Sequence, residues 1–102
     1  MVLVPGTRLR SAVDDTEVVV VRAPATSVTL RCGGMPMVTP EQVSTDRAVI
    51  DARFADRTTI GKRYLDDASG LEVLCIRAGN GSLSVDLRPL SVRPPKRLPA
   101  SD

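Results

Sequence analysis

Histidine is absent from this 102-residue chain, and its only two cysteines, Cys32 and Cys75, lie far apart in the sequence. Histidine is the commonest general base, the usual partner of a nucleophilic serine or cysteine, and the commonest nitrogen ligand for metals. Most familiar catalytic sites therefore cannot form. The composition predicts that the chain is not an enzyme and that it holds no cofactor.

Two adjacent carboxylate pairs, Asp14-Asp15 and Asp66-Asp67, are the remaining groups with catalytic potential. Either pair could act as an acid/base couple or bind Mg²⁺. Each pair, however, precedes a run of strand-forming residues by a few positions, where aspartate commonly hydrogen-bonds to the local backbone. We therefore expect both pairs to be turn residues.

The two cysteines allow different interpretations. Cys75 lies in the apolar run Leu74-Cys75-Ile76, which predicts a buried and unreactive thiol. Cys32 is followed by Gly33-Gly34 and allows two interpretations. It is either a small core side chain beside a tight turn, or, together with Asp14 or Asp15, the remnant of a metal site that a second subunit completes.

Two pairs of strand-like runs predict two β-hairpins. Residues 17–22 and 26–31 flank the turn at residues 23–25. Residues 71–77 and 82–86 flank Gly79-Asn80-Gly81, which we interpret as a hairpin turn because no helix follows it to bind a phosphate.

The two hairpin regions are similar to each other. Aligning Gly6 with Gly61 superposes residues 6–32 on 61–87 without a gap and with seven identities, where about two are expected by chance. After a two-residue deletion, Met35-Pro36-Met37 aligns with Arg88-Pro89-Leu90. The pattern predicts a single all-β domain of residues 1–102, in which two tandem hairpin units, 6–38 and 61–92, pack as one small barrel or sandwich.

Two further segments complete the domain. The linker, residues 39–60, is polar overall but carries Val49, Ile50 and Phe54, which can anchor it on the core. From Arg88 to Asp102, four prolines and four basic residues predict an extended segment without regular structure, and residues 93–102 form the tail beyond the second unit.

Residues 5–38 resemble the knuckle of desulforedoxins and of the N-terminal part of desulfoferrodoxins, in which four cysteine thiolates bind one iron or zinc. The similarity is clearest in Leu30-Arg31-Cys32-Gly33-Gly34-Met35-Pro36-Met37, which looks like the closing Leu-Val-Cys-Cys-Gly-x-x-Met segment of that family. The resemblance implies the knuckle fold, once directly and once more through the repeat.

The resemblance does not extend to the family's metal site. Its four thiolate positions correspond here to Ala12, Asp15, Arg31 and Cys32, so one thiol remains. In the second unit the positions are Asp67, Gly70, Asp86 and Leu87. We expect Arg31 to pair instead with Asp14 or Asp15, with a guanidinium and a carboxylate in the place of metal and thiolates.

Charge and hydropathy limit the partners. The net charge of +2 is dispersed along the sequence, and one Phe, one Tyr and no Trp leave little to stack on bases, so nucleic-acid binding is not expected. No apolar run is long enough for a membrane span and no signal peptide begins the chain, which predicts a cytoplasmic protein with free thiols.

Thin β-units bury little apolar area, so the chain is expected to associate, either with further copies of itself or with a larger protein. Three functions remain open. The first is a non-catalytic accessory protein that forms homo-oligomers or docks on a larger protein. The second is a small metal or redox protein with a reduced site of Cys32, Asp14 and Asp15. The third includes a carboxylate-based enzyme and a pocket for an anionic ligand between the units, which the repeated arginines Arg8, Arg63, Arg22 and Arg77 would line. The candidate binding residues are Arg31, Arg8 and Arg63.

Overall fold

The longest strands are the two six-residue runs rich in β-branched and aliphatic side chains, β2 (Glu17–Arg22) and β6 (Glu72–Arg77). They pair antiparallel at the centre of a five-stranded sheet with the order β1-β2-β6-β5-β9. Strand alternation turns Val18 and Val20 of β2 into the core. The computed structural model describes residues 2–42 and 45–93.

The remaining strands are two or three residues long. The five-stranded sheet is completed by β1 (Arg8–Arg10), β5 (Arg63–Leu65) and β9 (Ser91–Val92). A four-stranded antiparallel sheet, in the order β4-β3-β7-β8, contains β3 (Leu30–Cys32), β4 (Met35–Pro36), β7 (Leu83–Val85) and β8 (Arg88–Pro89).

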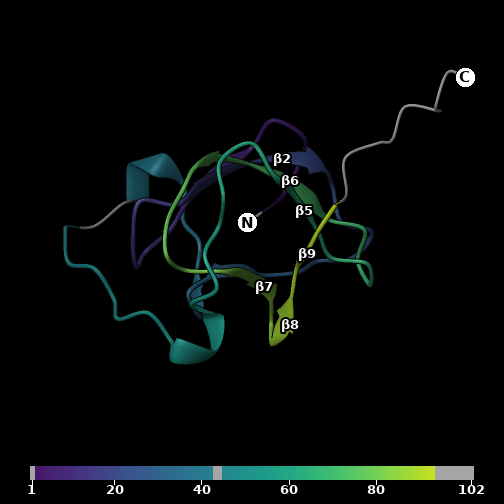
Figure 1. Ribbon diagram of the computed structural model, residues 1–102. Helices are drawn as coiled ribbons and strands as arrows, with labels where there is room; N and C mark the ends of the chain where they lie inside the picture. The colour runs from purple at the N-terminus through teal and green to yellow at the C-terminus, as the bar shows by residue number, and fades with distance from the viewer. Residues whose placement is uncertain (1, 43–44, 94–102) are drawn as a thin grey trace, which may run out of the picture.

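The two sheets form two layers with one core between them (Figure 1). Val18 and Val73 from the five-stranded sheet and Leu30 and Val85 from the four-stranded sheet belong to the same buried cluster. The all-β prediction is confirmed. The two sheets remain separate, so the arrangement is sandwich-like rather than a closed barrel.

The predicted hairpin partners are wrong. β2 and β3 lie in different sheets, as do β6 and β7, so residues 23–29 and 78–82 connect the layers instead of reversing the chain within one layer. The hairpins in fact join β1 to β2, β3 to β4, β5 to β6 and β7 to β8. An apolar strand face needs a covering layer, and the crossover supplies one for both strands.

Corresponding strands of the two halves have equal lengths. The alignment of Gly6 with Gly61 places β1 and β2 exactly on β5 and β6, whereas β3 and β4 match β7 and β8 only after the second half is shortened by two positions. The deletion therefore lies between β2 and β3 and not after Cys32, as the sequence alignment placed it. The pairing is centred on Val19 opposite Leu74 in one sheet and on Arg31 opposite Ser84 in the other.

The linker contains two short 3₁₀ helices, η1 (Pro40–Gln42) and η2 (Ala52–Phe54). Phe54 is buried with 5% of its surface exposed, whereas Val49 is 89% exposed and does not anchor the linker. The backbone N–H of Ser82 donates to the carbonyl of Phe54 over 2.8 Å, which fixes η2 beside the start of β7.

The expectation that regular structure ends at Arg88 is wrong for residues 88–92, which form β8 and β9. Pro89 is tolerated because β8 is an edge strand, where a missing N–H costs no sheet hydrogen bond. The rest of the predicted extended tail, residues 94–102, lies outside the described residues. Within the described ranges, no helix is long and apolar enough to span a membrane.

Candidate interaction surface

The outer face of the five-stranded sheet carries one row of residues that crosses four strands. The register places Arg8 beside Val19, Val19 beside Leu74, and Leu74 beside Arg63. Directly opposed residues of neighbouring strands share a face, so two arginines flank two aliphatic side chains in this row.

The centre of this face is apolar. Val19 and Leu74 are partly exposed, and each has an aliphatic neighbour further along its strand, Val21 in β2 and Ile76 in β6, where the register of the two strands shifts. The two irregularities occupy corresponding positions of the repeat. A bulge increases strand twist and shifts the residues that follow it. As a result, Arg22 at the end of β2 lies opposite Glu72 at the start of β6, and Arg77 at the end of β6 lies opposite Glu17 at the start of β2.

A glutamate with three arginine neighbours lies on one side of this centre. Glu17 accepts hydrogen bonds from Arg8 at 2.6 and 3.0 Å, and Arg10 lies 3.6 Å from its other oxygen. Arg77 is its cross-strand partner. The Glu17 side chain is only 9% exposed, so these guanidinium groups largely shield its charge from solvent.

The other side carries the corresponding cluster around Glu72. Arg93 donates to Glu72 over 2.5 Å, Arg63 lies 3.5 Å away, and Arg22 is the cross-strand partner. The Glu72 side chain is 1% exposed. Arg93 also donates its backbone N–H to the carbonyl of Arg63 over 2.8 Å, which extends the pairing of β9 with β5.

These residues define a basic surface, here called the arginine face. Six arginines against two glutamates leave it a net charge of +4, whereas the whole chain carries +2. The rest of the molecule is therefore net acidic. The face consists of Val19, Val21, Leu74 and Ile76 with Glu17, Glu72, Arg8, Arg10, Arg22, Arg63, Arg77 and Arg93.

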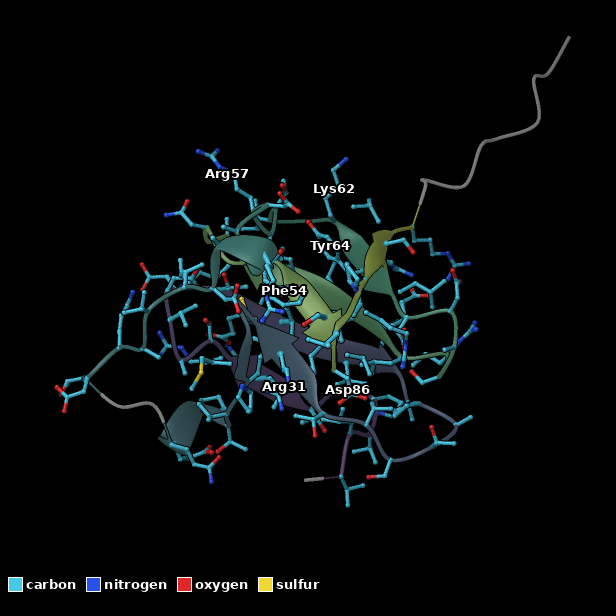
Figure 2. All side chains as sticks on the ribbon, turned by 90° about the horizontal axis from the view of Figure 1, so that it is seen from below. Arg31, Phe54, Arg57, Lys62, Tyr64 and Asp86 are labelled. Atoms are coloured by element: carbon cyan, nitrogen blue, oxygen red, sulfur yellow. The ribbon has the colours of Figure 1, made fainter. Side chains whose placement is uncertain are left out.

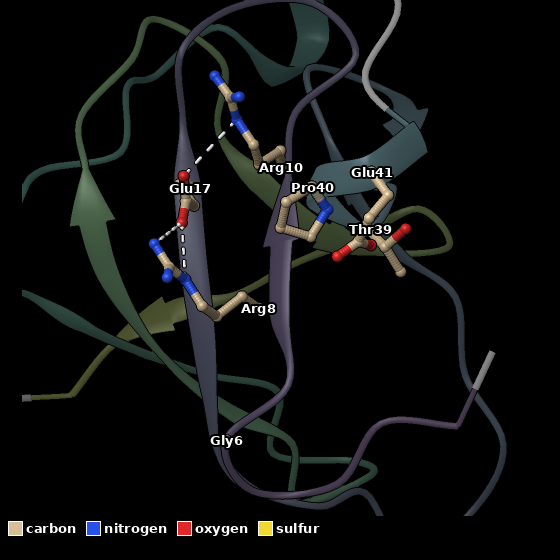
Figure 3. A pocket seen from close by; sticks show the side chains of 7 residues that line it. All are labelled: Gly6, Arg8, Arg10, Glu17, Thr39, Pro40 and Glu41. Carbon is tan, nitrogen blue, oxygen red and sulfur yellow. Dashed lines mark hydrogen bonds and ion pairs between the residues drawn. The ribbon is translucent and has the colours of Figure 1, made fainter.

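A hollow of about 520 Å³ lies at one end of the arginine face, where η1 stands beside β1. Figure 3 shows Arg8 and Arg10 reaching from β1 to Glu17, with Pro40 and Glu41 on the other side of the strand. At the other end, Arg93 of the β9 extension occupies the position that corresponds to Pro40. Arg93 donates its backbone N–H to β5, but Pro40 has no N–H, so it cannot donate the corresponding hydrogen bond to β1.

The structure separates the three predicted binding residues. Arg8 and Arg63 both lie on the arginine face, with Arg22 and Arg77, on the outer side of the five-stranded sheet. Arg31 instead lies in β3 of the four-stranded sheet (Figure 2). Its guanidinium donates a hydrogen bond to the carbonyl of Gly34. It belongs to a different surface.

The expected pairing of Arg31 with Asp14 or Asp15 is wrong. Asp14 accepts backbone hydrogen bonds from Thr16 and Gly81, at 2.9 and 2.7 Å, and Asp15 pairs with Arg47 on the surface. Each aspartate has a nearer donor, so neither needs the guanidinium of β3.

The predicted metal-ligating residues do not present open ligands. Cys32 is fully buried, and burial raises the pKa of its thiol to about 11. Both oxygens of Asp14 accept backbone N–H groups. Within residues 2–42 and 45–93, no cluster of three or more Cys, Asp or Glu side chains is arranged to hold a metal ion.

Sequence reasoning missed Arg10, Glu17, Glu72 and Arg93. A signal was available, because Glu17 and Glu72 are identical residues of the repeat at the start of the two long strands. What the sequence lacks is the antiparallel pairing of β2 with β6, which brings each glutamate to an arginine of the other half.

Comparisons with known proteins give no relative for this chain: no family model, no curated protein and no solved structure matches it.

Proposed function

We propose that this is a non-catalytic protein that binds an acidic protein partner through the arginine face. The observation that carries the proposal is the apolar centre of Val19, Leu74, Val21 and Ile76 between two arginine-rich clusters. Apolar residues at the centre and arginine around them are typical of protein–protein interfaces, where arginine is enriched and lysine is depleted.

Nucleic acid is a poorer fit to this surface. Four of the six arginines already share two buried glutamates, which reduces the charge available to phosphates. The chain's single Tyr and Phe, Tyr64 and Phe54, are both buried and cannot stack on bases from this face.

A second copy of the chain is also disfavoured as the occupant of this face. Packing the face on itself would bring a net charge of +4 against another +4, and like charges at an interface cost several kcal/mol. A partner with aspartates or glutamates around an apolar patch would complement both parts of the surface. Homo-oligomers, where they form, are then expected to use other surfaces.

The hollow beside η1 supports a defined orientation of the partner. Apart from this hollow, the two ends of the arginine face are nearly equivalent, so a partner could bind in either of two orientations. Pro40 and Glu41 form a wall at the β1 end, whereas Arg93 fills the corresponding place at the β5 end. A partner side chain that enters the hollow would select one orientation.

We infer further that the chain is a duplicated unit, because strands of equal length recur in the same order in both halves. The desulforedoxin-like origin of that unit remains a proposal based on the residues around Cys32. The metal or redox alternative has less support, because a thiol with a pKa of about 11 is protonated at neutral pH and binds metals poorly in that form.

The test is affinity capture from cell extract with quantitative mass spectrometry, comparing wild type with Leu74→Glu and with the double variant Arg22→Gln/Arg77→Gln. Arg22 and Arg77 form no ion pair within the described ranges, and neutral glutamine leaves the ion pairs of Glu17 and Glu72 with the other four arginines in place without adding a like charge opposite them. Arg57→Glu, an exposed site outside the five-stranded sheet, is the matched control.

We expect one acidic protein to be captured by wild type and by Arg57→Glu and lost with both face variants. Its purified form should bind the double variant roughly tenfold more weakly in isothermal titration calorimetry. Circular dichroism must show that all variants are folded. Capture that is equal for all variants, or a dimer that the face variants abolish in native mass spectrometry, would overturn the proposal.

A further inference from the structure

The connection between β6 and β7, residues 78–82, packs against the turn between β1 and β2. The backbone N–H of Gly81 donates to Asp14 Oδ2 over 2.7 Å, and the Gly81 carbonyl accepts from the hydroxyl of Thr58 over 2.6 Å. The carbonyl of Asn80 accepts from the backbone N–H of Arg57 over 3.0 Å. Contacts from the first unit and from the linker therefore hold this connection.

Close packing favours glycine on both sides of Asn80. A Cβ atom at position 79 would lie 2.0 Å from Thr16 Oγ1 and 2.7 Å from Asp14 Oδ2, which excludes a side chain there. A Cβ atom at position 81 would lie 3.0 Å from Cys32 Sγ and 3.0 Å from the backbone nitrogen of Gly33, so the β3–β4 turn would have to move. The fold thus selects glycine at positions 79 and 81, and with Asn80 between them the chain carries an Asn-Gly pair in this connection.

An Asn-Gly pair with an exposed asparagine is chemically labile. The backbone nitrogen of Gly81 can attack the Asn80 side-chain carbonyl carbon, which forms a C–N bond, releases ammonia and closes a succinimide ring. Water then opens the ring to aspartate or isoaspartate. Glycine favours the attack because no Cβ blocks the nitrogen and its backbone is conformationally permissive. The Asn80 side chain is exposed, so water has access.

We infer that Asn80 is a site of spontaneous deamidation and that Asp14 holds the reaction in check by binding the backbone N–H of Gly81. The nitrogen that would attack is the same atom that donates to Asp14 Oδ2. It must leave this charge-assisted hydrogen bond before it can reach the side chain of Asn80. Asp14 thus restrains the backbone nitrogen that the glycine leaves accessible.

Deamidation would alter the packing of the two halves. Isoaspartate reroutes the main chain through the former side chain and inserts one methylene group. The Asn80 carbonyl and the Gly81 N–H could then no longer meet Arg57 and Asp14 together. The inference does not depend on the partner proposed above, because these residues lie outside the arginine face.

The test follows the mass increase of the peptide that contains Asn80 by liquid chromatography and mass spectrometry during prolonged incubation of the intact protein at neutral pH. Wild type is compared with Asp14→Asn and Asp14→Ala. Asp15→Ala is the matched control, because Asp15 is the adjacent carboxylate and pairs with Arg47 instead. Urea-unfolded wild type gives the rate without protection.

We expect Asn80 to deamidate roughly tenfold faster in folded Asp14→Ala than in wild type, with Asp14→Asn between them and Asp15→Ala unchanged. If Asp14→Ala does not fold, the comparison of Asp14→Asn with wild type decides. Equal rates in wild type and Asp14→Asn would overturn the inference. A slower reaction without Asp14 would also overturn it, since the carboxylate would then be acting as a base that activates the nitrogen.

Discussion

The turns before the two long strands show how the two halves exchange residues while keeping their geometry. Ser11 and Asp14 in the first half correspond in the repeat to Asp66 and Ser69 in the second, so serine and aspartate change places. In both turns the residue before the strand donates its N–H to the side chain at the second of these positions. The backbone pairing of Ser11 with Thr16 recurs between Asp66 and Leu71.

This exchange places one buried or half-buried carboxylate in each turn. Burial alone would raise the pKa of Asp14, but hydrogen bonds from the backbone of Gly81 and Thr16 outweigh it and hold the pKa below 3.8. Burial is likewise outweighed at Asp66, where hydrogen bonds from Arg88 and Ser69 lower the pKa. The serines keep the turns closed without adding a second charge.

Acid should destabilise the protein through Asp14. A folded-state pKa below that of the unfolded chain adds stability above pH 3.8, which is lost as the pH falls through the folded-state pKa. We expect the free energy of unfolding of wild type to fall more than that of Asp14→Asn between about pH 5 and pH 2. Urea titrations at a series of pH values measure both, and parallel pH profiles would contradict the prediction.

At the scale of elements, the linker is anchored by backbone contacts as much as by apolar side chains. Asp51 caps η2 through the N–H of Arg53 and donates its own N–H to the carbonyl of Gly33 over 2.9 Å. Arg53 lies over the ring of Phe54, 5.6 Å from its centre. The helix is therefore attached to the β3–β4 turn at one end and to the start of β7 at the other.

Removing the Phe54 side chain should be costly. Its ring is buried, and truncation of a buried aromatic residue to alanine destabilises proteins by about 3–5 kcal/mol through lost contacts and a cavity. We expect Phe54→Ala to lower the free energy of unfolding by an amount in this range. Val49→Ala, at an exposed position of the same linker, should change it by less than about 0.5 kcal/mol in the same urea experiments.

At the scale of the whole molecule, neither half has a core of its own. β2 pairs with β6 and β3 pairs with β7, so both central contacts join the first half to the second. The buried cluster likewise takes residues from both halves and both sheets. Such sharing predicts that the halves fold and unfold together.

A core substitution in one half should therefore destabilise both. Leu9 is 1% exposed in β1, and Leu9→Ala is expected to cost about 2–5 kcal/mol. Far-UV circular dichroism and hydrogen exchange of the β6 and β7 amides should report one shared unfolding transition, at a lower denaturant concentration than in wild type. Two separate transitions, or protection of β6 that persists after β2 has opened, would contradict this prediction.

The two long strands, β2 and β6, and parts of β3 and β7 could be predicted from the sequence, whereas the short strands β1, β4, β5, β8 and β9 were not. The runs of β-branched and aliphatic residues at 17–22 and 71–77 predict strands, and β2 and β6 lie there. The internal repeat also indicated that Arg8 and Arg63 are equivalent. These features are local, since periodicity and residue type along a short segment are enough to show them.

Strand partners and the arginine face required the tertiary structure. No local signal distinguishes a hairpin of β2 and β3 from a crossover between two layers, because both satisfy the same alternation; the crossover covers both apolar faces. Glu17 and Arg77 belong to different halves of the chain and meet only through the register of β2 with β6. The sequence alone therefore determined the two long strands and the correspondence between the two halves, whereas the pairing of the two halves decided where the charges meet, because that pairing depends on contacts that no single segment contains.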